Sequence, residues 1–143
     1  MKQALTEKKT IRNVNAGGVL TPQGFSAAGY HAGLRYSKLD IGMILSEKPA
    51  SAAAVYTTSH FQAAPLLVTK ESIAETGKIQ AVIVNSACAN ACTGQQGLDD
   101  AYKMRALTAE AFQVEEHHVA VASTGVIGEY LQMDKIEKGI KSL

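Results

Sequence analysis

The sequence predicts a mixed α/β (α+β) domain in which helices form a layer on a sheet. The order of segments carries this prediction, because short apolar strands come first and a strand–helix–strand–helix alternation follows. Composition agrees, since 46% of the 143 residues are apolar, which is enough for a buried core. This length suits one domain or one large piece of a domain.

The first half of the chain contains turn signals between short apolar runs. Residues 16–25 hold three glycines and a proline and predict a loop. Residues 39–45 and 52–58 flank the turn-like stretch "SEKPAS", so we expect them to form paired strands. Residues 65–68 predict another strand, followed by a short helix that ends at Gly77, a residue type that favours helix C-termini.

The second half gives stronger patterns. Residues 79–86, "IQAVIVNS", are compact and β-branched and predict a strand buried on both faces. Residues 98–114 predict a helix, with Asp99 and Asp100 near its N-terminus, where negative charge is favourable. Its apolar positions recur at helical spacing, at Ala101, Met104, Leu107 and Ala111. A strand is expected at 117–123 and an amphipathic helix from about Asp134.

The charge balance excludes several classes of partner. The net charge is only +1, and no basic stripe indicates nucleic-acid binding. The longest apolar runs are too short to span a membrane. The first ten residues, "MKQALTEKKT", are charged and lack the apolar core of a signal peptide, so we expect a cytoplasmic protein.

Cys88 and Cys92 are the two cysteines of the chain. In a reducing compartment they favour free thiols over a disulfide. A zinc site would need further ligands, and His117 and His118 are adjacent in sequence, an arrangement that rarely converges on one metal ion. We therefore expect no metal and no cofactor.

Residues 85–97, "NSACANACTGQQG", join the strongest predicted strand to the strongest predicted helix. Small residues, asparagines and glycines at such a crossover are typical of a tightly packed loop, or of a backbone that approaches a ligand closely. Neither G-x-x-x-x-G-K-[ST] nor G-x-G-x-x-G occurs, so a phosphate loop is not indicated.

The stretch Ser123-Thr124-Gly125 ends an apolar strand. A glycine N–H and a threonine hydroxyl at a strand end can form an oxyanion hole, although the same residues also close ordinary turns. No nucleophile is evident beside them. The G-x-S-x-G elbow is absent, no carboxylate pair stands out, and His31 lies far along the chain, where a packed or surface role is the simpler interpretation.

Several stretches, in this order and spacing, resemble the ornithine acetyltransferase (ArgJ) family from about Ala16 onward. They are "TPQGFSAAGYHAGLR", "AAVYTTS", "AAPLLVTK", "VNSACANACTG", "STGVIG" and "LQMDKIEKGI". Two details depart from the family's common pattern. Ala87 and Cys88 stand where glycine and asparagine are usual, and Ser59 replaces the asparagine of "T-T-N".

The resemblance implies an acetyltransferase of arginine biosynthesis. Its precursor cuts itself before a threonine, and that residue becomes the nucleophile at the N-terminus of a β chain. Acetyl passes from N-acetylornithine to glutamate through an acetyl-threonine, and acetyl-CoA is a further possible donor. Thr124, through its hydroxyl, and Gly125, through its N–H, are implied to form the oxyanion hole. An α2β2 assembly of the two chains is also implied.

The expected organisation is a polar lead-in over 1–15 and part of the α chain over 16–143. The chain stops at Leu143, soon after its last predicted helix begins, so we expect a fragment that ends before the self-cleavage segment and lacks the nucleophile and the substrate-binding residues. Two alternatives remain open from the sequence. One is a self-cleaving aminopeptidase of the same fold, and the other is a non-catalytic small-molecule-binding or interaction module.

Overall fold

The computed structural model describes residues 17–143, so the expected lead-in over 1–15 lies outside the described residues. The described chain contains four strands, three α-helices and one short 3₁₀ helix. In chain order they are β1 (Phe25–Tyr30), β2 (Ile41–Ser51), α1 (Ala64–Thr76), β3 (Lys78–Asn85), α2 (Gly94–Phe112), η1 (Glu116–His118), β4 (Val119–Ser123) and α3 (Met133–Ile140). A mixed α+β fold is thereby confirmed.

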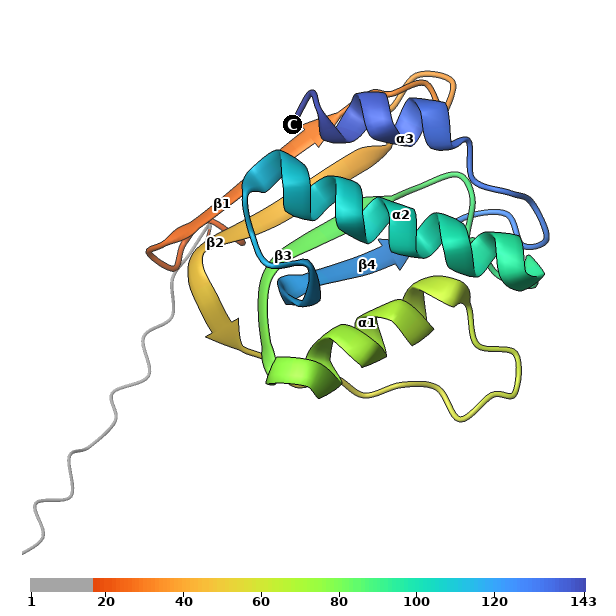
Figure 1. Cartoon of the computed structure of the whole chain (residues 1–143). Coiled ribbons are helices and arrows are strands. Elements are labelled where there is room, and N and C mark those ends of the chain that lie inside the picture. Colours follow the sequence, from red (N-terminus) through yellow and green to blue (C-terminus); the bar gives the residue numbers. More distant parts are fainter. Residues whose placement is uncertain (1–16) are drawn as a thin grey trace, which may run out of the picture.

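The sheet has the order β1-β2-β3-β4. The first two neighbouring pairs are antiparallel, whereas β3 and β4 are parallel and are joined by the α2 crossover. All three α-helices lie on one side of the sheet (Figure 1). Because β3 and β4 run in the same direction, their carboxyl ends meet at one edge, where the motif Thr124-Gly125 follows β4.

The core lies between the sheet and these helices. Ile83 on β3 sits opposite Met43 of β2 and Val121 of β4, and all three side chains are buried. Helix residues complete the cluster, among them Val68, Met104 and Ile136, each fully buried. Successive strand residues point to opposite faces, so this row defines the inner face of the sheet.

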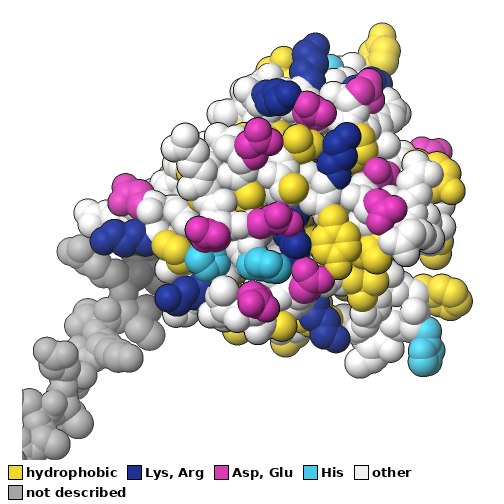
Figure 2. All heavy atoms as spheres, in the orientation of Figure 1, with side chains coloured by type: hydrophobic (Ala, Val, Ile, Leu, Met, Phe, Trp, Pro, Cys, Tyr) yellow, Lys and Arg dark blue, Asp and Glu magenta, His cyan; other side chains and the backbone are white. Residues whose placement is uncertain are grey.

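The outer side of the helix layer carries charges of both signs, interspersed with histidines (Figure 2). Beneath it, the nearly buried Arg105 of α2 contacts Glu71 of α1 at 3.0 Å and Glu116 of η1 at 2.9 Å. A hydrogen bond from Tyr102 and the Arg105 guanidinium hold the pKa of the Glu71 carboxyl below its usual value. These contacts join both long helices to the segment that leads into β4.

Strand β4 lies at the edge of the sheet, where its unpaired backbone groups need other partners. The Thr69 hydroxyl of α1 supplies them, because it donates to the Val121 carbonyl at 2.8 Å and accepts from the Val121 N–H at 2.9 Å. This pair of bonds fixes the strand that precedes Thr124.

The predicted strand pair at 39–45 and 52–58 is wrong. The structure has one long strand, β2, that runs through the supposed turn, and residues 52–58 lie in no helix or strand. Pro49 lies within β2 where the pairing with β3 shifts register, between Leu45 and Ala50. Such an irregularity tolerates proline because the ladder hydrogen bond is already missing there.

The predicted strand at 65–68 is also wrong, because α1 already begins at Ala64. Proline occupies the first turn of this helix. The N–H groups of a first turn make no hydrogen bond within the helix, so the missing N–H of proline costs no bond there. The predicted end of the helix is confirmed. Gly77 adopts the left-handed conformation and its N–H donates to the Ile73 carbonyl at 2.8 Å.

The remaining predictions were closer. Strands β3 and β4 and helix α3 are confirmed within one or two residues. Helix α2 begins at Gly94, so Asp99 and Asp100 lie beyond its first turn, which contains no acidic residue. Strand β1 was missed, since its small, largely exposed residues give no apolar alternation.

The buried Asp40, just before β2, organises the loop over residues 31–39. Its carboxylate accepts N–H donors from Ala32 at 2.6 Å, Gly33 at 3.1 Å and Arg35 at 2.9 Å. His31 Nδ1 lies 3.2 Å from the same carboxylate. Burial alone would raise the pKa of Asp40, but the backbone donors of Arg35 and Ala32 outweigh it, so the pKa lies below its usual value.

Asp40→Asn is expected to destabilise the complete protein by about 1.5–3 kcal/mol near neutral pH, the range for hydrogen bonds to a charged group. Because the folded-state pKa is lowered, the carboxylate stabilises the fold above its unfolded pKa of about 3.9, and this contribution is lost as pH falls through the folded pKa. Urea unfolding of both proteins between pH 7 and 3 measures the difference. A difference that does not shrink below about pH 4 would contradict this assignment.

Candidate active site at the ends of β3 and β4

Thr124 and Gly125 are held against the loop that follows β3. The Thr124 N–H donates to the Asn85 carbonyl at 3.1 Å, which continues the pairing of the two strands by one residue. Beyond Gly125, the Val126 N–H donates to Ala87 at 2.9 Å, and the Val126 carbonyl accepts from the Ala89 N–H at 2.9 Å. Bonds on both sides therefore fix the backbone of Thr124 and Gly125.

Gly125 satisfies two constraints that other residues would not. Its φ is +135°, in the region that L side chains rarely adopt. A Cβ at this position would also collide with the carbonyl group of Ala87 and the nitrogen of Cys88. The turn after β4 therefore packs directly on the Ala87–Cys88 peptide, and only glycine permits this contact.

Both candidate donors are unused. Within residues 17–143, neither the Thr124 hydroxyl nor the Gly125 N–H makes a hydrogen bond to another protein group. Both residues are exposed, and they line a hollow of about 460 Å³. The rest of its lining comes from Arg35, Ser86, Ala87 and Val126. The structure thus brings two available donors to the wall of one hollow, which an oxyanion hole requires.

Unpartnered polar atoms gather at the same edge of the sheet. Asn85 and Ser123 are paired in register at the ends of β3 and β4, and Ser86 follows Asn85. The Asn85 Oδ1 and the hydroxyls of Ser86 and Ser123 are buried without a partner among the described residues. Buried polar groups usually have hydrogen-bond partners. Unpartnered oxygens at the carboxyl ends of β3 and β4 are therefore typical of a functional site.

Sequence reasoning missed the role of Asn85. Its fully buried side chain donates from Nδ2 to the Cys88 carbonyl at 2.9 Å and so shapes the loop on which Gly125 packs. The available signal in the sequence was an asparagine at the end of the most apolar strand. Its side-chain amide can form hydrogen bonds to backbone groups at the point where pairing between strands ends.

The rest of the crossover over 85–97 fits the packing interpretation. The buried Asn90 donates to the Gly97 carbonyl at 2.7 Å and accepts from the Thr93 hydroxyl at 2.8 Å. Cys88 is buried and lies 3.0 Å from the Glu129 carbonyl, whereas Cys92 is exposed, and both are free thiols. Among residues 17–143, no group of three or more His, Cys, Asp and Glu could hold a metal ion.

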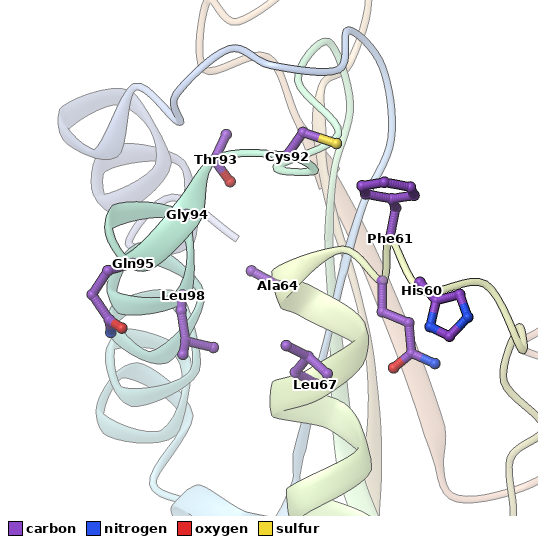
Figure 3. Close-up of a pocket in the computed structure, with 10 residues that line it drawn as sticks. His60, Phe61, Ala64, Leu67, Cys92, Thr93, Gly94, Gln95 and Leu98 are labelled. Atoms are coloured by element: carbon purple, nitrogen blue, oxygen red, sulfur yellow. The ribbon is translucent and has the colours of Figure 1, made fainter.

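A second pocket, of about 310 Å³, opens between the first turns of α1 and α2. Figure 3 shows Ala64 and Leu67 of α1 facing Leu98 of α2, with the Cys92 sulfur directed toward Phe61. Its lining contains no Asp, Glu, Lys or Arg. Apart from His60, the lining offers a charged ligand no ion-pair partner, whereas Arg35 lines the hollow beside Thr124.

None of the described helices is long and apolar enough to cross a lipid bilayer. His31, which sequence reasoning set aside, donates from Nδ1 to the Lys38 carbonyl at 2.8 Å and stabilises the 31–39 loop. His117 and His118 belong to η1, before β4, and do not approach the candidate site.

The fold and site together define a two-layer α+β protein with paired, unused hydrogen-bond donors at the end of a parallel strand. The chain belongs to the ArgJ family, whose sequence model matches residues 26–143. The resemblance inferred from the motifs is thereby confirmed.

Individual relatives agree with this membership. The arginine biosynthesis bifunctional protein ArgJ of Geobacillus kaustophilus is 67% identical over 142 residues, covering 97% of this chain and 35% of the relative. That of Geobacillus stearothermophilus is 69% identical over 133 residues, covering 93% of this chain and 32% of the relative. The chain therefore spans about a third of the length of these curated relatives.

Two crystal structures share the fold. The arginine biosynthesis bifunctional protein ArgJ of Bacillus halodurans is 61% identical with a TM-score of 0.87, over 89% of this chain and 66% of that chain. The ornithine acetyltransferase of Mycobacterium tuberculosis, solved with ornithine, is 40% identical with a TM-score of 0.84, over 91% of this chain and 70% of that chain. The described chain therefore has the fold of the matching part of these two structures.

Gly125→Ala is expected to destabilise the complete protein by about 2 kcal/mol or more, because a strained φ is combined with a backbone collision. Gly128→Ala is the matched control. Its φ is +86°, but an added Cβ would meet nothing within 4 Å, so only the strain remains. Chemical denaturation of both variants measures the difference, and equal losses would show that the contact with Ala87 is unimportant.

Proposed function

We propose that the complete protein transfers acetyl from N-acetylornithine to glutamate in arginine biosynthesis, through an acetyl-threonine intermediate. This chain supplies the oxyanion hole, and the nucleophilic threonine lies on a β chain from the same precursor. The observation that carries the proposal is the pair of unused donors, Thr124 hydroxyl and Gly125 N–H, on the wall of one hollow. The names of the relatives, arginine biosynthesis proteins and an ornithine acetyltransferase, support the reaction class.

The first half-reaction forms the acetyl-enzyme. The threonine hydroxyl attacks the acetyl carbonyl carbon while its own α-amino group takes the proton. The carbonyl oxygen becomes an oxyanion, which Thr124 and Gly125 stabilise. The carbon–nitrogen bond then breaks, and ornithine leaves with the proton on its nitrogen.

The second half-reaction reverses these steps with a different amine. The amino group of glutamate attacks the acetyl ester, and the same two donors stabilise the second oxyanion. The carbon–oxygen bond breaks, the threonine hydroxyl regains a proton, and N-acetylglutamate leaves. Acetyl-CoA as an alternative donor enters by the first step with a thiolate as leaving group. The cycle needs no cofactor.

The uncovered face of the sheet supports a partner chain. Its central row is apolar and runs across three strands, from Ile44 through Val82 to Ala120, with Val84 and Ala122 beside it. The helices cover only the opposite face (Figure 1), so these side chains remain half-buried apart from Ala120, which is 8% exposed. The prediction that residues 79–86 are buried on both faces is met on one face only within the described chain.

An obligate partner that covers this face would bury an apolar interface above about 2,000 Å². The proposed occupant is the β chain of the same precursor. Two α chains and two β chains form the proposed assembly (a heterotetramer of composition α2β2), which acts in the cytoplasm. The self-cleaving aminopeptidase remains the second candidate within the fold. It would release free acetate or an amine without transfer to glutamate, so product analysis separates the two.

Thr124→Ala is expected to lower kcat for both half-reactions by about 10²–10³, the usual cost of losing one oxyanion donor. KM for glutamate should stay nearly constant, because the donor acts on the transition state and not on the bound substrate. Steady-state kinetics of the complete enzyme measure both quantities. Thr124→Ser keeps the hydroxyl and should retain much more activity, whereas a change in KM without a change in kcat would refute the oxyanion role.

Val82→Asp is expected to prevent assembly, because it places a charge at the centre of the uncovered apolar face. Leu67→Asp, in the pocket between α1 and α2 on the helix side of the sheet and 41% exposed, is the matched control and should leave assembly intact. Copurification of the two chains and size-exclusion chromatography give the readout. Normal assembly of Val82→Asp would exclude this face as the interface.

A further inference from the structure

Asn85 contacts both the residue that follows β4 and the loop against which that turn packs. Its backbone carbonyl accepts the Thr124 N–H at 3.1 Å, and its side-chain Nδ2 donates to the Cys88 carbonyl at 2.9 Å. The Asn85 side chain is fully buried at the end of β3. A buried carbonyl that loses its donor is costly to leave unpaired, so a side chain that cannot donate would allow the Cys88 carbonyl to move.

The peptide group after Cys88 is held at both ends. Asn85 binds its carbonyl, and its N–H donates to the Val126 carbonyl at 2.9 Å. The Ala87 carbonyl, one peptide earlier, accepts the Val126 N–H at 2.9 Å. Gly125 packs against this earlier peptide group, closely enough that a Cβ would collide with it. The Asn85 amide therefore reaches the seat of Gly125 through a single residue of the loop.

Ala87 lies inside the turn that Asn85 closes, and its backbone is strained. Its φ is +91°, in the region that residues with a Cβ rarely adopt. Such a conformation persists only where surrounding contacts hold it. Asn85 supplies one of these contacts from the core side, and Val126 supplies another. Loss of the Asn85 amide would let Ala87 relax, and the peptide beneath Gly125 would move with it.

A second buried asparagine of the same loop serves a different purpose. Asn90 is also fully buried, and it donates to the Gly97 carbonyl at 2.7 Å. Its Oδ1 accepts the Thr93 hydroxyl at 2.8 Å. Both of these partners belong to the start of α2. The amide of Asn90 therefore fixes the beginning of this helix, whereas the amide of Asn85 fixes the loop beneath Gly125.

We propose that Asn85 is a positioning residue for acetyl transfer, because its amide holds Ala87 in the strained conformation on which the placement of Thr124 and Gly125 depends. This inference rests on the proposed oxyanion role of those two residues. The Asn85 side chain is fully buried, so it acts through the backbone and not on the substrate. A small displacement of the donors is sufficient, since misplacement by about 1 Å can lower a rate by about 10²-fold.

The test compares Asn85→Leu with Asn90→Leu in the complete enzyme. Each change removes a fully buried amide that donates to a backbone carbonyl, so both should destabilise the fold. Asn85→Leu is expected to lower kcat per folded enzyme by about 10–10²-fold with little change in KM, whereas Asn90→Leu should leave kcat nearly unchanged. Steady-state kinetics give both constants, and urea unfolding gives the folded fraction. Asn85→Ala, which adds no bulk, supplies the same comparison if Asn85→Leu does not assemble.

Two double variants distinguish positioning from general destabilisation. Ala87→Gly removes the strain at φ +91°, so combining it with Asn85→Leu should restore part of the lost kcat. In a Thr124→Ala background, Asn85→Leu should lower kcat by a smaller factor than it does alone. The two changes damage the same oxyanion contacts, and effects on a shared contact are not additive.

The outcomes separate this inference from the proposed function. Equal losses of kcat in Asn85→Leu and Asn90→Leu would overturn the positioning role, and so would full additivity of Asn85→Leu with Thr124→Ala. Failure of Ala87→Gly to restore any kcat would also contradict it. In each of these cases acetyl transfer by the wild type still stands. If the wild type transfers no acetyl to glutamate, the proposed function itself fails.

Discussion

The contact between Gly125 and the Ala87–Cys88 peptide is the constraint on which the candidate site depends. It joins the turn after β4 to the loop after β3, at the one parallel pair in the sheet. Asn85 shapes that loop from inside the core, through its bond to the Cys88 carbonyl. A side chain at position 125 would push the two loops apart and displace Thr124 and Gly125 from the hollow that they line together.

The site is rigid on one side and open on the other. Backbone hydrogen bonds, the Thr69 contact with β4 and the Asp40 loop fix the backbone of the segments that line the hollow beside Thr124. The buried oxygens of Ser86 and Ser123, in contrast, have no partner in the described chain, and the outer face of the sheet is uncovered. Preorganised donors facing an incomplete cavity suit an electrostatic role in a reaction whose nucleophile comes from elsewhere.

The sequence predicted the elements whose signals are local and missed those set by tertiary context. The β-branched run before Asn85 and the periodic residues of α2 were sufficient because each buries a continuous apolar face. Pro49 was mistaken for a turn residue because the register shift that accommodates it exists only once β3 pairs with β2. The local pattern made Thr124 and Gly125 candidates and the family resemblance favoured them as oxyanion donors, which stays a prediction. Arg35 lines the same hollow from about 90 residues away, through a loop whose shape depends on the burial of Asp40.

The order of strands also determines when the candidate site can exist. The first three strands all precede the α2 crossover in the chain, so they can pair with one another before β4 has been synthesised. Strand β4 must wait for the α2 crossover and then dock in parallel, which is intrinsically slower. A nascent chain consequently exposes the outer apolar face of β2 and β3 before the turn at Thr124 and Gly125 has formed, so this face needs protection before the candidate site is complete.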